Sequence, residues 1–296
     1  MIVAGKSGLR RLMRAVGRRL PGLRALSGRL GLGRFLAPQG TLERLTLDDD
    51  VIIELDLSVP IYRYLYFHHD LANIPELGLI PALLAPERAF VDVGAHIGYL
   101  GLVGAKYARR AFLYEPGLAS FERMMRNLAL NPELAAKITA RRIAISSTSG
   151  EMTLYASLAG PDTASLRALS PDAVSESVRV ETLDAEVPPD SRVGLIKIDV
   201  EGAEMDVLDG ARRILAQDQP VILIELVEEN QRAFDRTCSE LVSQLESLGY
   251  AGFEVAGDRH EPRLTELKRG PAAPGEIVNA VFAPRAQLES LKRWRN

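Results

Sequence analysis

The sequence predicts an α/β fold, in which a mostly parallel, Rossmann-like sheet is covered by helices on both faces. From about residue 88 onward, apolar runs of strand length alternate with helical patterns. This alternation is typical of right-handed βαβ crossovers. The strand candidates are nearly continuous in Val, Ile, Leu and Phe, as expected when both faces of a sheet are buried. The chain has 296 residues, 47% of them hydrophobic, which is enough for one large domain of this class with additions.

The individual elements follow from the hydrophobic periodicity. Strands are expected at 89–93, 111–115, 138–145, 195–199, 221–226, 251–255 and 277–283. Helices are expected at 99–109, 118–130, 203–216 and 230–248. Glu151–Ser157 and Ser177–Leu183 alternate apolar and polar residues, which predicts an antiparallel pair of strands. The segment between them, 158–176, is rich in Ser, Ala, Pro and Asp and is expected to form a surface loop.

The stretch before the first predicted βα unit differs in charge. Residues 1–42 carry nine Lys and Arg and no Asp or Glu, so this +9 leaves the remaining chain at −12 within a total of −3. We expect a flexible basic arm. The alternative is that its apolar residues, spaced helically between arginines, place it on the inner face of an anionic membrane. Residues 43–88 contain a strand-like segment at Val51–Leu57 and are expected to form a cap. The main domain is expected at 89–284, followed by a tail at 285–296.

Composition excludes several classes of protein. The single cysteine, Cys238, allows no internal disulfide and indicates a reducing, cytoplasmic compartment. No stretch is long and apolar enough to span a bilayer. The acidic remainder of the chain provides no basic face for a duplex, so we expect no nucleic-acid partner.

A glycine-containing turn follows the first predicted strand of the main domain. Residues 89–98 read Ala-Phe-Val-Asp-Val-Gly-Ala-His-Ile-Gly and run into a helical pattern. Glycine tolerates positive φ and lets a ligand approach the backbone closely. The helix N-terminus behind the turn offers unpaired N–H groups. This arrangement predicts a nucleotide-like cofactor.

A second carboxylate narrows the choice of cofactor. Glu115 ends the second strand, where a carboxylate can accept hydrogen bonds from both ribose hydroxyls. A dinucleotide requires the compact G-x-G-x-x-G pattern, which the spacing of Gly94, Gly98 and Gly101 does not provide. Asp92 would repel a pyrophosphate but suits a sulfonium and an α-amino group. The residues therefore favour S-adenosylmethionine, and an NAD-dependent oxidoreductase is the alternative.

The fourth strand brings charged residues to the same end of the sheet. By strand alternation Lys197 and Asp199 share one face, and a lysine inside an apolar strand is costly unless a carboxylate such as Asp199 or Asp92 pairs with it. Glu201 and Glu204 follow at the start of the next helix, where acids favour the helix dipole, and Glu204 is expected to be such a first-turn acid. Oxygen ligands at these positions could hold a hard divalent cation, but no dedicated ligand pattern is present and we predict no metal.

Matching stretches run through the chain from about residue 62 to residue 284. They are the Val-Asp-Val-Gly-Ala-His-Ile-Gly-Tyr turn, Tyr-Glu-Pro at 114–116, Asn127, Asn131, Ala144–Ser146, Val180–Asp184, Ile196–Glu204, Ile224-Glu225 and Val278-Asn279. With these residues the chain resembles the FkbM-type S-adenosylmethionine-dependent methyltransferases. The resemblance implies a seven-stranded class I methyltransferase sheet whose last two strands form an antiparallel hairpin at the edge. It also implies O-methylation of a hydroxyl on a sugar, glycan or natural product.

The resemblance also assigns roles to residues. Asp92, Gly94 and Gly98 would hold the methionine end of the donor, Glu115 its ribose, and the turn at Ala144–Ser146 its adenine. The predicted donor-binding set is Asp92, Gly94, His96, Gly98, Tyr99, Glu115, Pro116, Ala144, Ile145 and Ser146. His96 stands where the family usually has Asn, and we expect it to stabilise the turn rather than to act as a base.

Methyl transfer to an alcohol needs alignment of the reactants and gains from a general base. Asp199 is the leading candidate, Glu201 the second and Glu225 the third, with Lys197 orienting Asp199. The competing interpretation is that these acids only pair with the lysine and cap a helix. His68 and His69 are weaker candidates for the base. A non-catalytic binding protein on the same fold and a nucleic-acid methyltransferase are the remaining alternative functions.

Overall fold

The computed structural model describes residues 40–47, 50–68, 74–157, 164–166, 173–267, 270, 271, 273 and 275–295. This part of the chain falls into two compact units, one ending at Ile74 and the other beginning at Pro75. The basic arm up to residue 39 and His69 lie outside the described residues, so their predicted roles stay predictions. Within the described ranges, no helix has the length and apolarity needed to cross a membrane.

The first unit contains a hairpin and a helix. Strands β1 (Leu42–Thr46) and β2 (Ile52–Asp56) pair antiparallel, and α4 (Pro60–His68) follows. The sequence predicts β2 but not β1. Strand β1 reads Leu-Glu-Arg-Leu-Thr, and its two leucines do not alternate with the polar residues as they would in a half-buried strand. His68 ends α4, and its side chain lies outside the described part of the structure.

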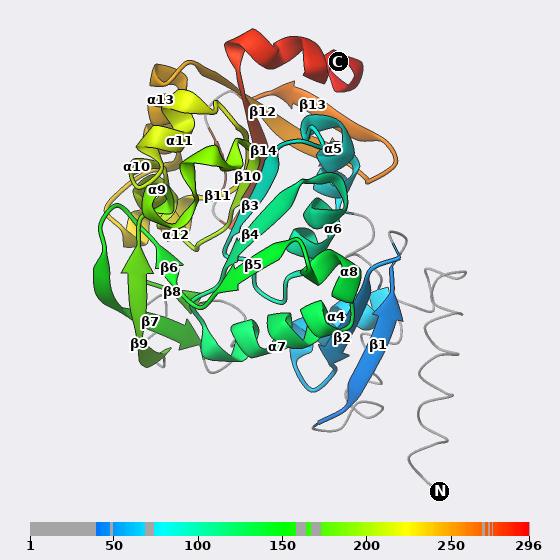
Figure 1. The fold of residues 1–296 in the computed structure, drawn as a ribbon. Coiled ribbons are helices and arrows are strands. Elements are labelled where there is room, and N and C mark those ends of the chain that lie inside the picture. The colour runs from blue at the N-terminus through cyan, green and yellow to red at the C-terminus, as the bar shows by residue number, and fades with distance from the viewer. Residues whose placement is uncertain are drawn as a thin grey trace, which may run out of the picture. The chain divides into compact units, whose positions relative to one another are not determined.

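The second unit is built on a sheet of eight strands in the order β13-β12-β14-β11-β10-β3-β4-β5 (Figure 1). Their bounds are β3 (Ala89–Val93), β4 (Arg110–Tyr114), β5 (Ile138–Arg141), β10 (Val193–Ile198), β11 (Val221–Val227), β12 (Tyr250–Gly257), β13 (Pro262–Glu266) and β14 (Ile277–Pro284). The five strands β5, β4, β3, β10 and β11 are parallel. The order reverses between β3 and β10, which is where open α/β sheets bind ligands.

The sheet has one strand more than the sequence predicts, at the edge next to β12. As expected, the last strand, β14, is antiparallel, and it pairs with both β11 and β12. The predicted seven strands account for all of the sheet except β13, an eighth strand that pairs antiparallel with β12. The sequence of β13, Pro-Arg-Leu-Thr-Glu, exposes its alternate polar residues and has too few apolar ones to stand out as a strand.

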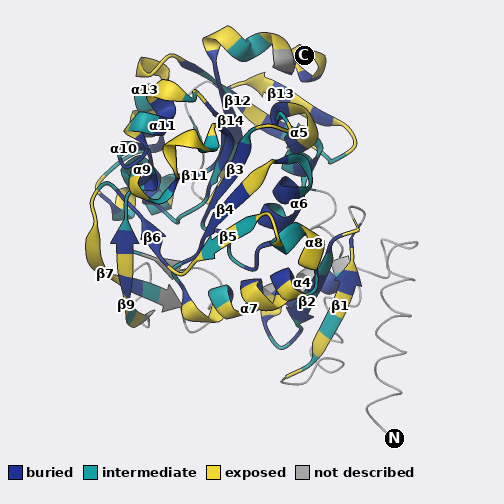
Figure 2. Cartoon of the chain, viewed as in Figure 1, coloured by how far each residue is buried: buried dark blue, intermediate teal, exposed yellow. Residues whose placement is uncertain are grey.

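Helices cover both faces of the sheet, which is buried between them (Figure 2). Their bounds are α5 (Pro75–Leu83), α6 (Tyr99–Tyr107), α7 (Leu118–Ala129), α8 (Pro132–Ala135), α9 (Leu183–Glu186), α10 (Glu204–Asp209), α11 (Arg212–Gln217), α12 (Glu228–Ala233) and α13 (Cys238–Ser247), with short 3₁₀ segments at Pro189–Ser191 and Arg285–Trp294. On one face Gly104 of α6 lies so close to Phe90 that a Cβ there would stand 2.2 Å from the ring. On the other, Val91 and Ile196 share a core cluster with Leu208 and Leu241.

Two predicted helices are broken in the structure. The span 203–216 divides into α10 and α11 around Gly210, where a Cβ would lie 2.1 Å from the carbonyl oxygen of Ser146. The span 230–248 divides into α12 and α13, and Thr237 begins the second helix with a capping box to Glu240. In both cases the apolar periodicity continues across the break, so periodicity alone does not reveal it.

A second sheet has four strands, which lie in the order β6-β9-β7-β8. Its bounds are β6 (Ala144–Ile145), β7 (Gly150–Ser157), β8 (Ala164–Ser165) and β9 (Ala173–Glu181). The predicted antiparallel pair is confirmed as β7 and β9. The predicted single strand at 138–145 is wrong, because its second half leaves the main sheet and pairs with β9. The predicted loop at 158–176 is also interrupted by β8 and by the start of β9.

Candidate active site

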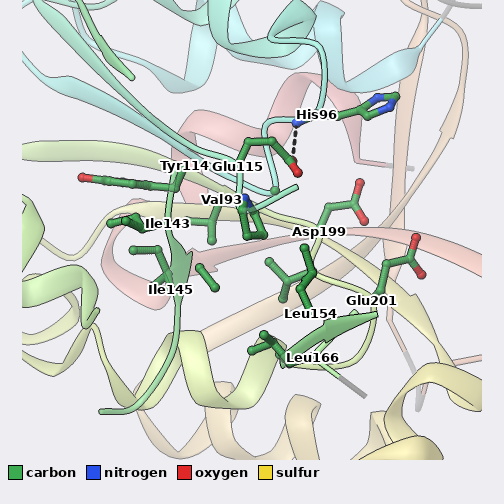
Figure 3. A pocket seen from close by; sticks show the side chains of 15 residues that line it. Val93, His96, Tyr114, Glu115, Ile143, Ile145, Leu154, Leu166, Asp199 and Glu201 are labelled. Atoms are coloured by element: carbon green, nitrogen blue, oxygen red, sulfur yellow. Dashed lines mark hydrogen bonds between the residues drawn. The ribbon is translucent and has the colours of Figure 1, made fainter. Parts of the chain in front are cut away.

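A pocket lies at the carboxyl ends of β3, β4 and β10 (Figure 3). It contains about 720 Å³ of empty space, its open mouth included. Eight residues of the predicted site line it, namely Gly94, His96, Glu115, Pro116, Ala144, Ile145, Asp199 and Glu201. The topological switch point between β3 and β10 and the predicted site residues therefore coincide.

The other six predicted site residues do not line the pocket. Asp92, Gly98, Tyr99, Ser146, Lys197 and Glu225 are not among the residues that line the pocket. Asp92 and Lys197 occupy partner positions on the adjacent strands β3 and β10. Ser146 is buried, and its backbone N–H donates to the carbonyl oxygen of Glu181. These residues can act on the pocket through the groups that they support or through their charge.

The glycine turn joins the ends of two strands. Gly94 has φ of +80°, and a Cβ there would lie 1.8 Å from the carbonyl oxygen of Asp199. The backbone N–H of Asp199 in turn donates to the carbonyl oxygen of Val93 at 3.0 Å. The absent Cβ of Gly94 thus permits close contact between two backbone segments. Asn127 of α7 supports the far end of the turn by donating to the carbonyl oxygen of Ile97 at 2.9 Å.

Glu115 lies buried at the centre of the pocket, with 6% of its surface exposed. Its two carboxylate oxygens each accept one backbone N–H, from His96 and from Gly117, both at 2.9 Å. Burial raises the pKa of Glu115, while its neighbour His96 and the two N–H groups oppose the rise. Each carboxylate oxygen keeps a second lone pair, so Glu115 is held rigidly and can still accept bonds from a ligand.

His96 contributes its backbone to this site. Its φ is +53°, a left-handed conformation in which Asn and His are several-fold enriched over other side chains. Its N–H, and not its imidazole, donates to Glu115 (Figure 3). The backbone of His96 thus links the glycine turn to Glu115, and the predicted turn-stabilising role of its side chain stays a prediction.

Apolar side chains form one side of the pocket and carboxylates the other (Figure 3). Ile143 and Ile145 flank Glu115 on the apolar side, and Leu154 and Leu166 complete it. Leu154 comes from β7, and Leu166 follows β8. Sequence reasoning missed these two residues, because contacts between distant segments, such as the pairing of β6 with β9, bring the small sheet to the pocket.

On the opposite side, Asp199 is paired with the lysine that the sequence predicts for it. The Lys197 Nζ lies 2.9 Å from Asp199 Oδ2 and 3.4 Å from the carbonyl oxygen of Gly94. Burial alone would lower the pKa of Lys197, but the carboxylates of Asp199 and Asp92 raise it above its ordinary value. Lys197 therefore stays charged and links the glycine turn to the carboxylate of Asp199.

Helix α12 supports the loop that carries Glu201. Asn230 donates to Glu201 Oε2 at 2.6 Å, and Glu201 itself has φ of +55°. Glu204 accepts from the backbone N–H groups of Val200 and Gly202 and from the side chain of Gln231. Burial raises the pKa of Glu204 to about 7. Glu204 is thus a first-turn acid, as the sequence predicts, and also the buried clamp of this loop.

Glu225 lies on β11, two residues beyond the partner of Lys197 in the register. Burial and then the charges of Asp199 and Glu201 raise its pKa to about 8. Glu225 therefore gives up its proton less readily than an ordinary glutamate. Among the described residues, no group of three or more His, Cys, Asp or Glu is arranged to hold a metal ion.

Asp92 is completely buried, and neither of its carboxylate oxygens has a hydrogen-bond partner of ordinary geometry among the described residues. Burial raises its pKa to about 6, although the charge of Lys197 opposes the rise. Because the folded protein then retains a proton that the unfolded chain has lost, this group reduces stability progressively as the pH rises from about 4 to about 6.

We expect Asp92→Asn to raise the free energy of unfolding of the ligand-free protein by about 1–3 kcal/mol at neutral pH, because it removes a buried charge. Urea denaturation at about pH 7.5 and about pH 4.5 checks this, and the gain should shrink at the lower pH, where Asp92 is neutral in the folded protein. An equal effect at both pH values would show that the carboxylate charge is not the cause.

Comparisons with known proteins find similar sequences and a similar solved structure. Residues 92–251 match the family model described as the methyltransferase FkbM domain. "Methyltransferase sdnD" of Sordaria araneosa is 29% identical over 237 residues, which cover 68% of this chain and 84% of that protein. "Methyltransferase 1" of Beauveria bassiana is 30% identical over 147 residues, which cover 42% of this chain and 59% of that protein. The crystal structure of a methyltransferase FkbM from Methylobacillus flagellatus KT aligns with a TM-score of 0.43 at 17% identity, over 75% of this chain and 54% of that one, so this chain spans about half its length.

Proposed function

This chain belongs to the FkbM methyltransferase family, and on that premise we propose that it methylates a hydroxyl oxygen of a sugar, a glycan or a natural product. It is a methyltransferase, and its methyl donor is S-adenosylmethionine. The oxygen acceptor is the part that we propose. The arrangement that carries the proposal is the pocket itself, with Glu115 at its centre, an apolar side and a carboxylate side.

The described residues suit the donor. A buried, rigidly held carboxylate such as Glu115 can accept hydrogen bonds from both ribose hydroxyls. The apolar side chains of Ile143, Ile145 and Leu154 offer a slot for an adenine ring. The turn at Gly94 would hold the methionine end, and the negative charge of Asp92 behind it favours the donor's sulfonium and α-amino cations.

When bound, the donor supplies an activated methyl group, and the protein must align the acceptor oxygen with it. Asp199 is placed to accept the hydroxyl proton of the acceptor, because it lines the pocket and is held by Lys197 at 2.9 Å. Lys197 positions this carboxylate and also contacts the carbonyl oxygen of Gly94. In this assignment the oxygen loses its proton to Asp199 as it gains the methyl group.

The other two candidates for the base fit less well. Glu201 also lines the pocket, and Asn230 engages its Oε2 as Lys197 engages Asp199 Oδ2, but Glu201 lies in the loop beyond the strand end and stays the second candidate. Glu225 lies outside the pocket lining, so it has no direct contact with an acceptor there. We therefore propose Asp199 as the base and keep Glu201 and Glu225 as its electrostatic surroundings.

The single buried cysteine supports a proposed cytoplasmic location, and the proposed membrane contact concerns residues outside the described part of the chain.

Calorimetric titration with S-adenosylhomocysteine and with NAD tests the donor half of the function. We expect S-adenosylhomocysteine to bind and NAD not to bind. Binding of NAD alone would favour an oxidoreductase, and binding of neither would favour a non-catalytic protein on a methyltransferase fold.

A further inference from the structure

Carboxylates gather on the acceptor side of the pocket. Asp199 and Glu201 line it directly. Glu225 stands on the next strand, on the face that carries Lys197, since Leu223 is the register partner of that lysine. Glu76, which sequence reasoning missed, lies in the first turn of α5, and its Oε2 is buried without a hydrogen-bond partner among the described residues. We call Glu76, Asp199, Glu201 and Glu225 the acidic wall.

These carboxylates lie within electrostatic reach of one another. The charge of Asp199 raises the pKa of Glu76, Glu201 and Glu225, in addition to the larger effect of burial on each. Such mutual effects require the groups to be close and poorly screened by water. Asp199 and Glu201 therefore present this charge at the pocket surface, and Glu76 and Glu225 add to it from outside the lining.

The positive charge described within this wall is already engaged. Lys197 donates to Asp199 and to the carbonyl oxygen of Gly94, and Asp92 faces it from the adjacent strand. Asp92 is wholly buried with both carboxylate oxygens unpartnered, so it adds further negative potential behind the pocket. An anionic group entering here would meet the carboxylates of Asp199 and Glu201, and the ammonium group of Lys197 is already bonded to Asp199 and Gly94.

We infer that the acidic wall selects the acceptor by charge, accepting neutral polyhydroxyl or amine-bearing compounds and rejecting those with a phosphate or carboxylate near the reacting hydroxyl. Hydroxyl and ammonium groups can donate to the wall, whereas an anion can only be repelled by it. This inference rests on the proposed function, because it assigns the acidic wall to the acceptor side of the same pocket.

The inference can be tested before the acceptor is known. Sinefungin resembles S-adenosylhomocysteine but carries an amine where the transferred methyl group would stand. We expect it to bind about 10-fold more tightly than S-adenosylhomocysteine by calorimetry, because the amine is cationic and faces the acidic wall. We expect the preference to fall about threefold or more in Glu76→Gln and in Glu201→Gln. Glu122→Gln on α7, an exposed glutamate outside the pocket lining, is the matched control and should keep the full preference.

The outcomes separate the two proposals. No preference for sinefungin, or an unchanged preference in both wall variants, would overturn the acidic wall as a charge filter while S-adenosylhomocysteine binding still upheld the donor site. Failure to bind S-adenosylhomocysteine at all would instead count against the proposed function.

In a second experiment, the protein is incubated with labelled donor and, in turn, with methyl glucoside, glucosamine, glucuronate and glucose 6-phosphate, and transfer of label to each compound is measured. Label in either anion in preference to the first two compounds contradicts the inference, and where none takes label the sinefungin comparison decides.

Discussion

Replacing Asp199 by Asn is expected to lower kcat by about 10²–10⁴-fold, the range that a positioned general base contributes. The amide keeps the shape of the side chain but cannot take up the acceptor's proton. Lys197 retains the charge of Asp92 on the adjacent strand, so the loss of its ion pair should leave the fold intact. The affinity for S-adenosylhomocysteine should stay within about threefold, because the ribose and adenine contacts are unchanged. Steady-state kinetics and calorimetry on the same preparation measure both quantities.

Asp206→Asn is the matched control for this variant. Asp206 also forms an ion pair at 2.9 Å, with Arg236, and its side chain is similarly sheltered, but it does not line the pocket. We expect it to turn over at nearly the wild-type rate. Near-normal turnover by Asp199→Asn would remove Asp199 from the role of base and leave it as the ion-pair partner of Lys197.

Glu115→Gln is expected to weaken the binding of S-adenosylhomocysteine about 100-fold, equivalent to about 2.7 kcal/mol. Hydrogen bonds to a charged group are each worth about 1.5–3 kcal/mol, and the ribose has two hydroxyls to lose. The Gln amide would also point its NH₂ group at the N–H of either His96 or Gly117, which both donate to Glu115 in the native protein. Calorimetric titration at a single pH measures the change.

Asp184→Asn separates this loss from general damage to the fold. Asp184 also accepts two backbone N–H groups, from Arg213 at 2.6 Å and from Ile214 at 3.1 Å, but it lies outside the pocket lining. It should lower the free energy of unfolding and leave the affinity for S-adenosylhomocysteine unchanged. Equal losses of affinity in Glu115→Gln and Asp184→Asn would mean that the effect at Glu115 is structural.

The site residues at the strand ends could be predicted from the sequence, because their positions follow from the local periodicity of strands and helices. Alternation of strands and helices places the ends of β3, β4 and β10 at one edge of the sheet. Strand alternation alone puts Lys197 and Asp199 on one face, and the structure confirms their contact. Glu115 followed from its place at the end of the second parallel strand.

The residues that complete the pocket or support its side chains could not be predicted from the sequence, because their positions depend on contacts between segments far apart in the chain. Leu154 lines the pocket from β7 of the small sheet, which β6 joins by pairing with β9. Asn230 supports Glu201 across 29 positions of sequence. Glu76 enters the acidic wall because α5 lies against β10. The sequence predicts that Gly94 lets a ligand approach the backbone. The structure adds a second reason for glycine at this position, because the absent Cβ makes room for the carbonyl oxygen of Asp199.

The central claim is that this pocket transfers the donor's methyl group to oxygen. Incubation of the protein with ¹³C-methyl S-adenosylmethionine and a panel of neutral sugars and natural-product alcohols, followed by NMR of the labelled product, tests it most directly. We predict a product whose labelled methyl carbon has the chemical shift and couplings of a methyl ether, formed by the wild-type protein and lost in Asp199→Asn. Label attached to nitrogen or carbon, or transferred equally well by Asp199→Asn, would contradict the account.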